Sequence, residues 1–181
     1  MFTMKKAYVF RGPPSSGKGA LTKEIIKLLS PKVALLELDY FRWGPHYVNR
    51  EVGDVSEDEH LFAYHNFLLM LESYCQNGNY DLVIEGLFTW DKENPSGNIQ
   101  DIVRILKKYN FEYELFLLSA DKEILWERNQ KRKHVVPLYE FETLYKTVME
   151  TIGNSEIIIN VGDLTIEDSI NMIKQKLFNQ T

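Results

Sequence analysis

Short apolar runs alternate with longer stretches of helical periodicity along the chain, and this alternation limits the possible fold more than any other feature. The short runs have the length of strands, and the longer stretches repeat their apolar residues at the spacing of one helix face. We expect strands over residues 6–11, 33–38, 80–85, 112–118 and 156–161. We expect helices over residues 18–30, 58–77, 98–109, 121–133, 138–151 and 166–178. Strands alternating with helices predict an α/β fold with a five-stranded parallel sheet and helices on both faces.

Length and composition fit one packed domain. The chain has 181 residues, 44% of them hydrophobic, which allows a core without a metal or disulfide staple. Cys75 is the only cysteine and cannot close an internal disulfide. No linker, repeat, signal-peptide core or apolar run of about 20 residues stands out. We therefore expect one domain over residues 1–181, a cytoplasmic location and no membrane partner.

The net charge is –5, so no overall positive field attracts polyanions. Any contact with nucleic acid would have to be local.

A glycine-rich segment follows the first predicted strand and opens the first predicted helix. It fits the pattern GxxxxGK, in which backbone N–H groups converge on phosphate oxygens and the lysine reaches the terminal phosphates. An ordinary turn with a surface lysine is the alternative interpretation. The predicted phosphate-binding residues are Gly12, Pro13, Pro14, Ser15, Ser16, Gly17, Lys18, Gly19 and Ala20.

Gly19 stands where most such loops carry the Ser or Thr whose hydroxyl reaches Mg²⁺. Ala20 offers no hydroxyl either. In this respect the chain resembles the adenylate kinases, which also have Gly after the lysine. The pattern therefore predicts that Mg²⁺ is held mainly by phosphates, waters and a carboxylate elsewhere.

The loops at the carboxyl ends of parallel strands share one mouth, where ligands bind. Asp39 follows the second predicted strand, and Arg42 comes one helical turn later. Asp39 is a candidate general base or Mg²⁺ ligand, and Arg42 could clamp a phosphate or carboxylate of an acceptor. Alternatively, Asp39 is a helix cap with an intrahelical partner.

The third predicted strand ends in Glu85, which resembles the acidic residue of a Walker B strand. Glu85 is a candidate Mg²⁺ ligand through water, or an acceptor contact. A solvated glutamate at a strand end is the alternative. Nearby aromatic residues could wall an acceptor pocket or belong to the core, namely Phe41, Trp43, Tyr47, Phe88 and Trp90.

Arg128 and Arg132 are four residues apart in a predicted helix, so we expect both guanidinium groups on one helix face, where they could grip one phosphate chain. A solvated basic helix end is the alternative. The four histidines show no spacing typical of metal ligands.

Taken in order, these motifs resemble the kinase domain of polynucleotide 5′-hydroxyl kinases and related small P-loop kinases. That family has Asp-x-x-Arg after the second strand, matched by Asp39 and Arg42, and a lid of the form Arg-Asn-x-x-Arg followed by Val-Pro, matched by residues 128–132 and 136–137. The resemblance implies a three-layer P-loop NTPase fold with a short Arg-rich lid at about residues 127–138. It also implies the use of ATP and Mg²⁺.

The resemblance further implies a role for each matched residue. Asp39 would act as base for an acceptor hydroxyl, Arg42 would contact an acceptor phosphate, and Arg128 and Arg132 would bind donor phosphates beside Lys18. Trp43 and Glu85 are further acceptor-side candidates. The implied activity is transfer of the γ-phosphate of ATP to a hydroxyl group, on a polynucleotide or on a small compound such as a nucleoside, sugar or antibiotic. An ATP-binding regulatory module impaired at Gly19 is the alternative from another class.

Overall fold

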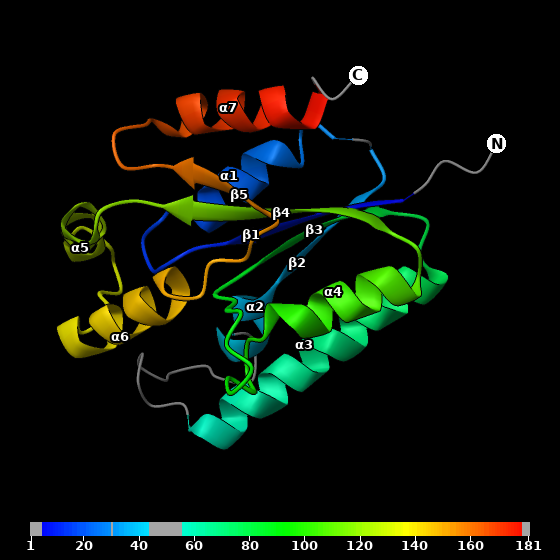
Figure 1. Ribbon diagram of the computed structural model, residues 1–181, viewed down its shortest axis with the longest axis horizontal. Coiled ribbons are helices and arrows are strands. Elements are labelled where there is room, and N and C mark those ends of the chain that lie inside the picture. Colours follow the sequence, from blue (N-terminus) through cyan, green and yellow to red (C-terminus); the bar gives the residue numbers. More distant parts are fainter. Residues whose placement is uncertain (1–4, 30, 44–55, 179–181) are drawn as a thin grey trace.

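A five-stranded parallel sheet forms the centre of the protein (Figure 1). The computed structural model describes residues 5–29, 31–43 and 56–178. The strand order is β2-β3-β1-β4-β5, and each strand lies within one residue of its predicted bounds. The strands are β1 (Lys6–Arg11), β2 (Val33–Glu37), β3 (Asp81–Gly86), β4 (Glu112–Ser119) and β5 (Glu156–Asn160).

Helices connect the strands. They are α1 (Lys18–Ile25), α2 (Leu38–Trp43), α3 (Glu57–Asn77), α4 (Ile99–Lys108), α5 (Lys122–Gln130), α6 (Leu138–Met149) and α7 (Ile166–Phe178). Sequence periodicity did not predict α2, which is too short to show a helical repeat. None of the helices in the described segments is long and apolar enough to span a bilayer.

Two predicted helices end early in the structure. Helix α1 ends at Ile25 instead of residue 30, because the N–H groups of Lys27 and Leu28 donate to carbonyls three residues back and tighten the last turn. Helix α5 ends at Gln130 instead of residue 133. After α5 the N–H groups of Lys131 and Arg132 also donate to carbonyls three residues back, so Arg132 lies outside the helix.

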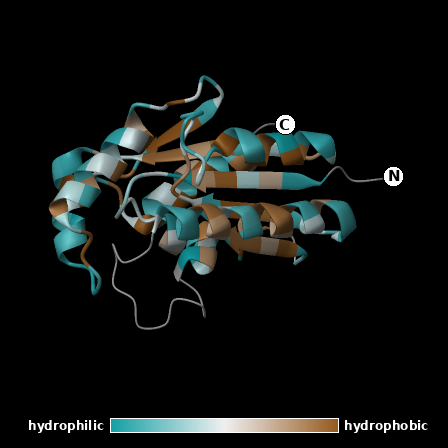
Figure 2. Ribbon diagram, turned by 90° about the horizontal axis from the view of Figure 1, so that it is seen from below, coloured by the Kyte–Doolittle hydropathy of each residue, from teal (hydrophilic) through white to brown (hydrophobic). Residues whose placement is uncertain are grey.

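Apolar side chains pack on both faces of the sheet. One layer joins the sheet to α3 and α4 through residues such as Phe67 and Ile102. The other joins it to α1 and α7, including Leu21 and Ile173, and continues to α5 and α6. The strands are largely brown in Figure 2, while the helices carry much of the teal, hydrophilic surface. These layers confirm the expected α/β fold with helices on both faces.

The connections after β1 and β3 diverge. Helix α1 follows β1 on one face of the sheet, whereas α4 follows β3 on the other. Such divergence leaves a crevice outside the carboxyl ends of the strands. These ends point toward α5 and α6 in Figure 1, so the loops predicted to carry the chemistry meet there.

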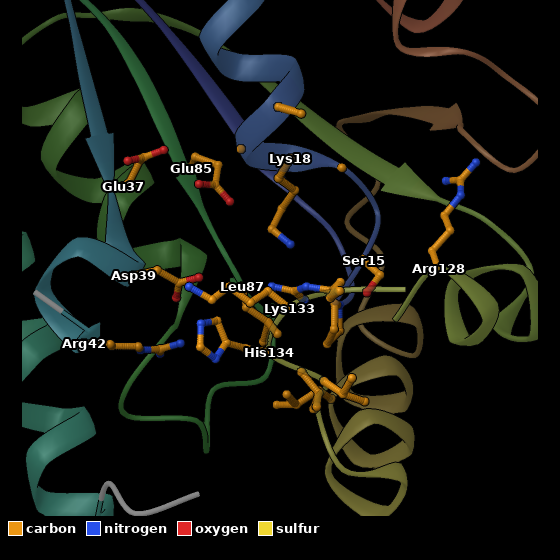
Figure 3. A pocket seen from close by; sticks show the side chains of 18 of the residues that line it. Ser15, Lys18, Glu37, Asp39, Arg42, Glu85, Leu87, Arg128, Lys133 and His134 are labelled. Carbon is orange, nitrogen blue, oxygen red and sulfur yellow. The ribbon is translucent and has the colours of Figure 1, made fainter. Parts of the chain in front are cut away.

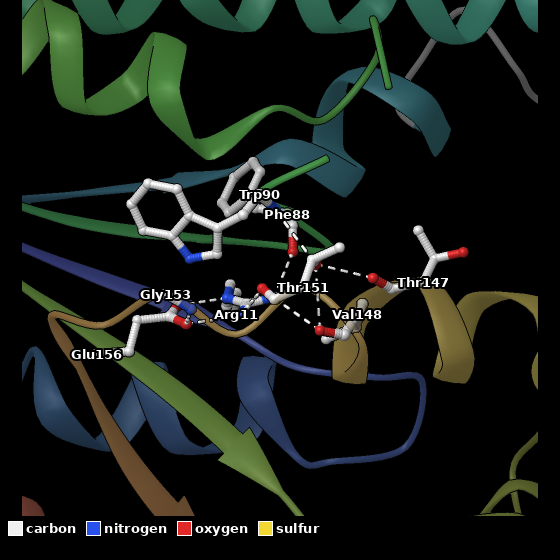
Figure 4. Close-up of polar contacts among 8 residues, drawn as sticks. All are labelled: Arg11, Phe88, Trp90, Thr147, Val148, Thr151, Gly153 and Glu156. Atoms are coloured by element: carbon white, nitrogen blue, oxygen red, sulfur yellow. Dashed lines mark hydrogen bonds and ion pairs between the residues drawn. The ribbon is translucent and has the colours of Figure 1, made fainter. Parts of the chain in front are cut away.

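A buried arginine anchors the end of β1, directly before the glycine-rich segment. Arg11 is fully buried and forms an ion pair with Glu156, with Nη2 2.7 Å from Oε2 (Figure 4). It also donates to the carbonyl oxygens of Phe88 and Val148, both at 3.1 Å, and of Thr151 at 2.7 Å. A buried ion pair is sustained when further hydrogen bonds satisfy its donors. Arg11 thus ties β1 to the β3 exit, to the end of α6 and to β5.

Candidate functional site

The segment from Gly12 to Gly19 forms a tight loop between β1 and α1. Ser15 and Gly17 have positive φ values of 64° and 85°, and Gly17 is the N-cap of α1. A Cβ on Gly12 would lie 2.6 Å from the carbonyl oxygen of Leu118, so only glycine fits there. Left-handed turns before a helix N-terminus direct backbone N–H groups into an anion-binding concavity. The loop therefore has the geometry of a phosphate-binding site.

Two serine hydroxyls add to this loop. The Oγ atoms of Ser15 and Ser16 are buried and have no hydrogen-bond partner among the residues that the structure describes. Ser15 lines the cavity in front of the loop, whereas Ser16 is packed behind it. A phosphate oxygen would satisfy the Ser15 hydroxyl.

Lys18 is held against its own loop. Its Nζ donates to the carbonyl oxygens of Gly12 and Pro13, both at 3.0 Å. Burial lowers the pKa of Lys18, the carboxylates of Glu85 and Asp39 raise it, and Arg132 lowers it. The ammonium group is thus prepositioned with weak carbonyl partners, which a phosphate would replace.

The backbone of Gly19 faces two carboxylates. A Cβ on Gly19 would lie 3.9 Å from both Glu37 Oε1 and Glu85 Oε2. Glu37 and Glu85 are register partners on β2 and β3, so their side chains emerge on the same face of the sheet. Glu37 was not among the predicted site residues, although its place at the carboxyl end of a strand, two residues before Asp39, was an available signal.

Glu85 is the buried member of this pair, with 6% of its surface exposed. Burial raises the pKa of Glu85 to about 7, Lys18 opposes the shift, and Asp39 and Glu37 add to it. Glu85 therefore lies within electrostatic reach of Lys18 and of Asp39.

Carboxylate oxygens at this place fit the chemistry of Mg²⁺, which prefers oxygen ligands and retains several waters. The described part of the chain contains no cluster of three or more His, Cys, Asp or Glu residues placed to hold a metal ion. The residues thus fit a cation that also takes ligands from water and phosphate.

Asp39 and Arg42 lie on α2, across the cavity from the loop (Figure 3). Arg42 Nη2 donates to the carbonyl oxygen of Ser96 at 2.6 Å, while its Nε is buried without a hydrogen-bond partner among the described residues. Burial lowers the pKa of Arg42, and Asp39 raises it. His60 of α3 lines the same cavity; burial and Arg42 lower its pKa. His60 was not among the predicted site residues.

The described aromatic candidates belong to the core and do not form a wall of the pocket. Phe88 is fully buried in the core, Phe41 packs edge-on against Phe67, and Trp90 packs on the core layer beside α3 and α4. Leu87 lines the cavity instead. The side chain of Trp43 and all of Tyr47, which were also predicted for this pocket wall, lie outside the residues that the structure describes.

The predicted pairing of Arg128 and Arg132 on one helix face is wrong, because α5 ends between them. Arg128 Nη2 donates to the carbonyl oxygens of Val161 and Gly162, both at 2.8 Å, and its side chain points away from Lys18 and Asp39 (Figure 3). Arg132 is exposed and close enough to influence the pKa of Lys18. The two arginines therefore differ in their partners.

A buried asparagine closes the loop that carries Arg132. Asn129 Nδ2 donates to the carbonyl oxygen of Val136 at 2.8 Å, and its Oδ1 accepts from the N–H of Val136 at 3.1 Å. Residues 130–135 thus form a short excursion fixed at its base, and Arg132, Lys133 and His134 of this excursion line the cavity.

These elements enclose one cavity of about 1210 Å³, which exceeds the usual volume of a pocket for one small ligand, about 300–1,000 Å³. Gly12, Pro13 and Ser16 are buried behind its surface. The predicted residues that line it are Pro14, Ser15, Gly17, Lys18, Gly19, Ala20, Asp39, Arg42, Glu85, Arg128 and Arg132.

No protein-family model and no curated protein sequence matches the chain. Solved structures do match. A provisionally assigned kinase from Chloroflexus aurantiacus has a TM-score of 0.72 at 14% identity, covering 100% of both chains. A sugar kinase from Janibacter has a TM-score of 0.66 at 14% identity, covering 97% of this chain and 95% of that one.

A chain of the Pnkp1/Rnl/Hen1 RNA repair complex has a TM-score of 0.65 at 15% identity, covering 83% of this chain and 46% of that one. Identities this low establish the architecture alone. With its glycine-rich loop between β1 and α1, the chain has the fold of the P-loop kinases.

Proposed function

We propose that this protein is an ATP-dependent kinase that transfers the γ-phosphate of ATP to a hydroxyl group. The observation that carries the proposal is that Lys18 and Asp39 face one cavity, from the loop after β1 and the helix after β2. The cavity is large enough for a nucleotide and an acceptor together. Phosphoryl transfer requires mainly such positioning and charge stabilisation.

The donor binds with its phosphates in the loop from Gly12 to Gly19. Their oxygens accept hydrogen bonds from the backbone and from Lys18, which leaves the carbonyls of Gly12 and Pro13. Arg132 is a lid cation whose charge acts on Lys18, and it adds positive charge where the transferring group passes. Arg128 orders the lid from its contacts with Val161 and Gly162.

Asp39 accepts the proton of the acceptor hydroxyl. The hydroxyl oxygen then forms a bond to the γ-phosphorus, and the bond between that phosphorus and the bridging oxygen of ADP breaks. The products are a phosphate ester and ADP, with the proton on Asp39.

Mg²⁺ would be held through water by Asp39 and Glu85, and by the donor phosphates. When bound, it supplies neutralisation of phosphate charge. Gly19 gives no hydroxyl to this ion, so the carboxylates carry more of the protein's share than in loops with Ser or Thr.

The acceptor side suits an alcohol that also carries acceptor oxygens. Arg42 offers a buried Nε that lacks a hydrogen-bond partner in the described part of the chain. A 5′-hydroxyl oligonucleotide fits the resemblance to polynucleotide kinases, and a small hydroxyl compound fits the net charge of –5 better. Trp43 remains a predicted contact for the acceptor.

A phosphoryl-transfer screen tests the proposal. ATP labelled at the γ-phosphate is offered with oligonucleotides, nucleosides, sugars and amino-glycol compounds, and the label is followed into acceptor, water and unreacted ATP. We expect label in at least one acceptor, lost in Asp39→Asn. ATP that binds but stays unconsumed with every acceptor would instead support the regulatory module, which the missing hydroxyl at Gly19 favours.

A further inference from the structure

Helix α3 carries large apolar side chains on the face that points away from the sheet. Its inner face packs Tyr64, Phe67 and Leu71 into the core. On the opposite face, Phe62 is 64% exposed and Leu69 is 53% exposed. A helix with apolar residues on both faces is typical of a helix that is covered on both sides. The outer face of α3 is therefore a candidate contact surface.

The exposed side chains form a continuous stripe along the helix. Residues three and four apart lie on one helix face, and Phe62, His65 and Leu69 have this spacing and are all exposed. Leu61 and Met70 are also exposed and flank them. We call these five residues the outer stripe. Single exposed apolar residues are ordinary, whereas a contiguous group on a helix at the outer edge of the molecule indicates an interaction site (Figure 1).

The outer stripe has the same apolar pattern in both directions from its centre. Phe62 lies as far before the midpoint between residues 65 and 66 as Leu69 lies after it. Leu61 and Met70 are related to this midpoint in the same way. A twofold axis there would make two copies of α3 antiparallel and pack Phe62 of each copy against Leu69 of the other, with Leu61 and Met70 at the flanks. The outer stripe is thus complementary to itself.

The first turn of α3 is acidic. It contains Glu57, Asp58 and Glu59, and the last of these is engaged in the capping box with Ser56. Glu57 and Asp58 are exposed. This end of the outer stripe therefore presents negative charge to a partner.

The other end of α3 lies beside basic groups. The last turn of α4 contributes Lys107 and Lys108, both exposed, and Lys108 forms an ion pair with Glu72 of α3. Lys5 Nζ donates to the carbonyl oxygen of Gly78 at 2.8 Å, directly after the helix. In an antiparallel pair, the acidic end of each copy would meet this basic end of the other. Charge complementarity of this kind selects the partner and its orientation.

We propose that the outer stripe of α3 binds the outer stripe of a second copy of this chain, with the two helices antiparallel about a twofold axis between residues 65 and 66. Two observations favour a second copy as the occupant: the symmetric apolar pattern and the opposite charges at the two ends of the stripe. The cavity lining in the described segments includes none of the five residues, so the pairing does not rest on the proposed kinase function.

Sedimentation velocity of the full chain over a concentration series tests the inference. We expect a monomer–dimer equilibrium. Phe62→Glu should weaken the dimer at least about tenfold, because it places a charge in the centre of the contact. The matched control is Ile166→Glu, at an apolar residue of α7 that is 51% exposed, and it should dimerise like wild type. Circular dichroism of each variant confirms folding.

Engineered cysteines test the antiparallel orientation. His65→Cys lies next to the proposed axis, so oxidation should link two copies by a disulfide. Ser73→Cys is exposed on the same side of α3, but in the antiparallel pair its two copies would be about 22 Å apart along the helices and should stay unlinked. The native Cys75 is buried, so wild type should also stay unlinked.

Three results would overturn the inference. The first is a monomer at every concentration, which would leave the outer stripe to a different partner protein. The second is a dimer that Phe62→Glu does not weaken. The third is a disulfide in Ser73→Cys without one in His65→Cys, because that result would require parallel helices.

Discussion

The two sides of the cavity are built in different ways. The proposed donor side is one continuous segment, Gly12 to Gly19, in which backbone geometry and a lysine held by its own loop form a phosphate-binding geometry. The proposed acceptor side collects side chains from α2, α3 and the β3 exit, which are far apart in the sequence. A continuous backbone site serves any phosphate chain, whereas a composite side-chain site can differ with each acceptor.

The largest effect should come from the donor side. Lys18→Ala should weaken ATP binding and lower kcat/KM by about 10³–10⁵-fold, the range for cations that stabilise a transferring phosphoryl group. The measurements are calorimetric ATP titration and initial rates of transfer. Lys27→Ala on the outer face of the same chain segment, paired with Glu24, is the control and should behave like wild type. Equal ATP affinity in Lys18→Ala and wild type would contradict the assignment of the loop to the donor site.

Asp39→Asn should act on the opposite side. We expect transfer to fall by about 10²–10⁴-fold, the usual contribution of a general base, with ATP affinity largely kept. Rates at saturating ATP and acceptor, together with nucleotide titration, separate the two effects. A variant that keeps most of its transfer activity would move the role of base to Glu85.

Substitutions of the two lid arginines should have different effects. Arg132→Ala should slow transfer by about 10²-fold with little loss of stability, because Arg132 is exposed and stabilises developing charge. Arg128→Ala removes two hydrogen bonds to carbonyls and should lower the free energy of unfolding by about 1–3 kcal/mol. Urea unfolding and transfer rates of both variants provide the comparison.

Hydrogen exchange over residues 127–138 adds a test of closure. We expect stronger protection with a non-hydrolysable ATP analogue than with ADP, since Arg132 would meet the γ-phosphate. Equal protection by both ligands, or none, would assign this segment to a solvated helix end.

A pH-dependent effect on stability concerns Glu85. Its pKa is raised from 4.5 to about 7, mainly by burial, so the folded state holds the proton more tightly than the unfolded state. Ionisation therefore costs stability increasingly from about pH 4.5 to pH 7, by up to about 3 kcal/mol. Without divalent cations, Glu85→Gln should gain stability over wild type as pH rises through this window. A pH-independent difference in urea unfolding would contradict the assignment.

The sequence predicted the elements whose pattern is local. The strands and the glycine-rich loop follow from apolar runs and from spacing within eight residues. The Ser56–Glu59 capping box that begins α3 was not predicted, and α3 starts one residue before its predicted bound. The early ends of α1 and α5 were missed. In α5 the cause is Asn129, whose bonds to Val136 turn the chain back, and propensity does not report such a contact.

In the candidate site, too, local sequence patterns predicted some residues, and those that depend on long-range packing were missed. Lys18 follows the loop after β1, Asp39 comes shortly after β2 and Glu85 lies near the end of β3, so the parallel sheet brings all three to one edge. Glu37 was missed although its place at the carboxyl end of β2 was a signal, whereas His60 was missed because only the packing of α3 brings it to the cavity. The partners of Arg128 depend on the position of β5, which helical spacing alone does not contain.

Nucleotide affinity in two sets of variants tests most directly whether the donor and acceptor sides are separate. Calorimetry with Mg²⁺ and a non-hydrolysable ATP analogue compares Lys18→Ala with the double variant Asp39→Asn, Arg42→Gln, after thermal unfolding has confirmed that each is folded. The account predicts that the double variant binds the analogue within about threefold of wild type, while Lys18→Ala loses at least about tenfold, near 1.4 kcal/mol. Equal loss of affinity in both would contradict it, because the acceptor residues would then belong to the nucleotide site.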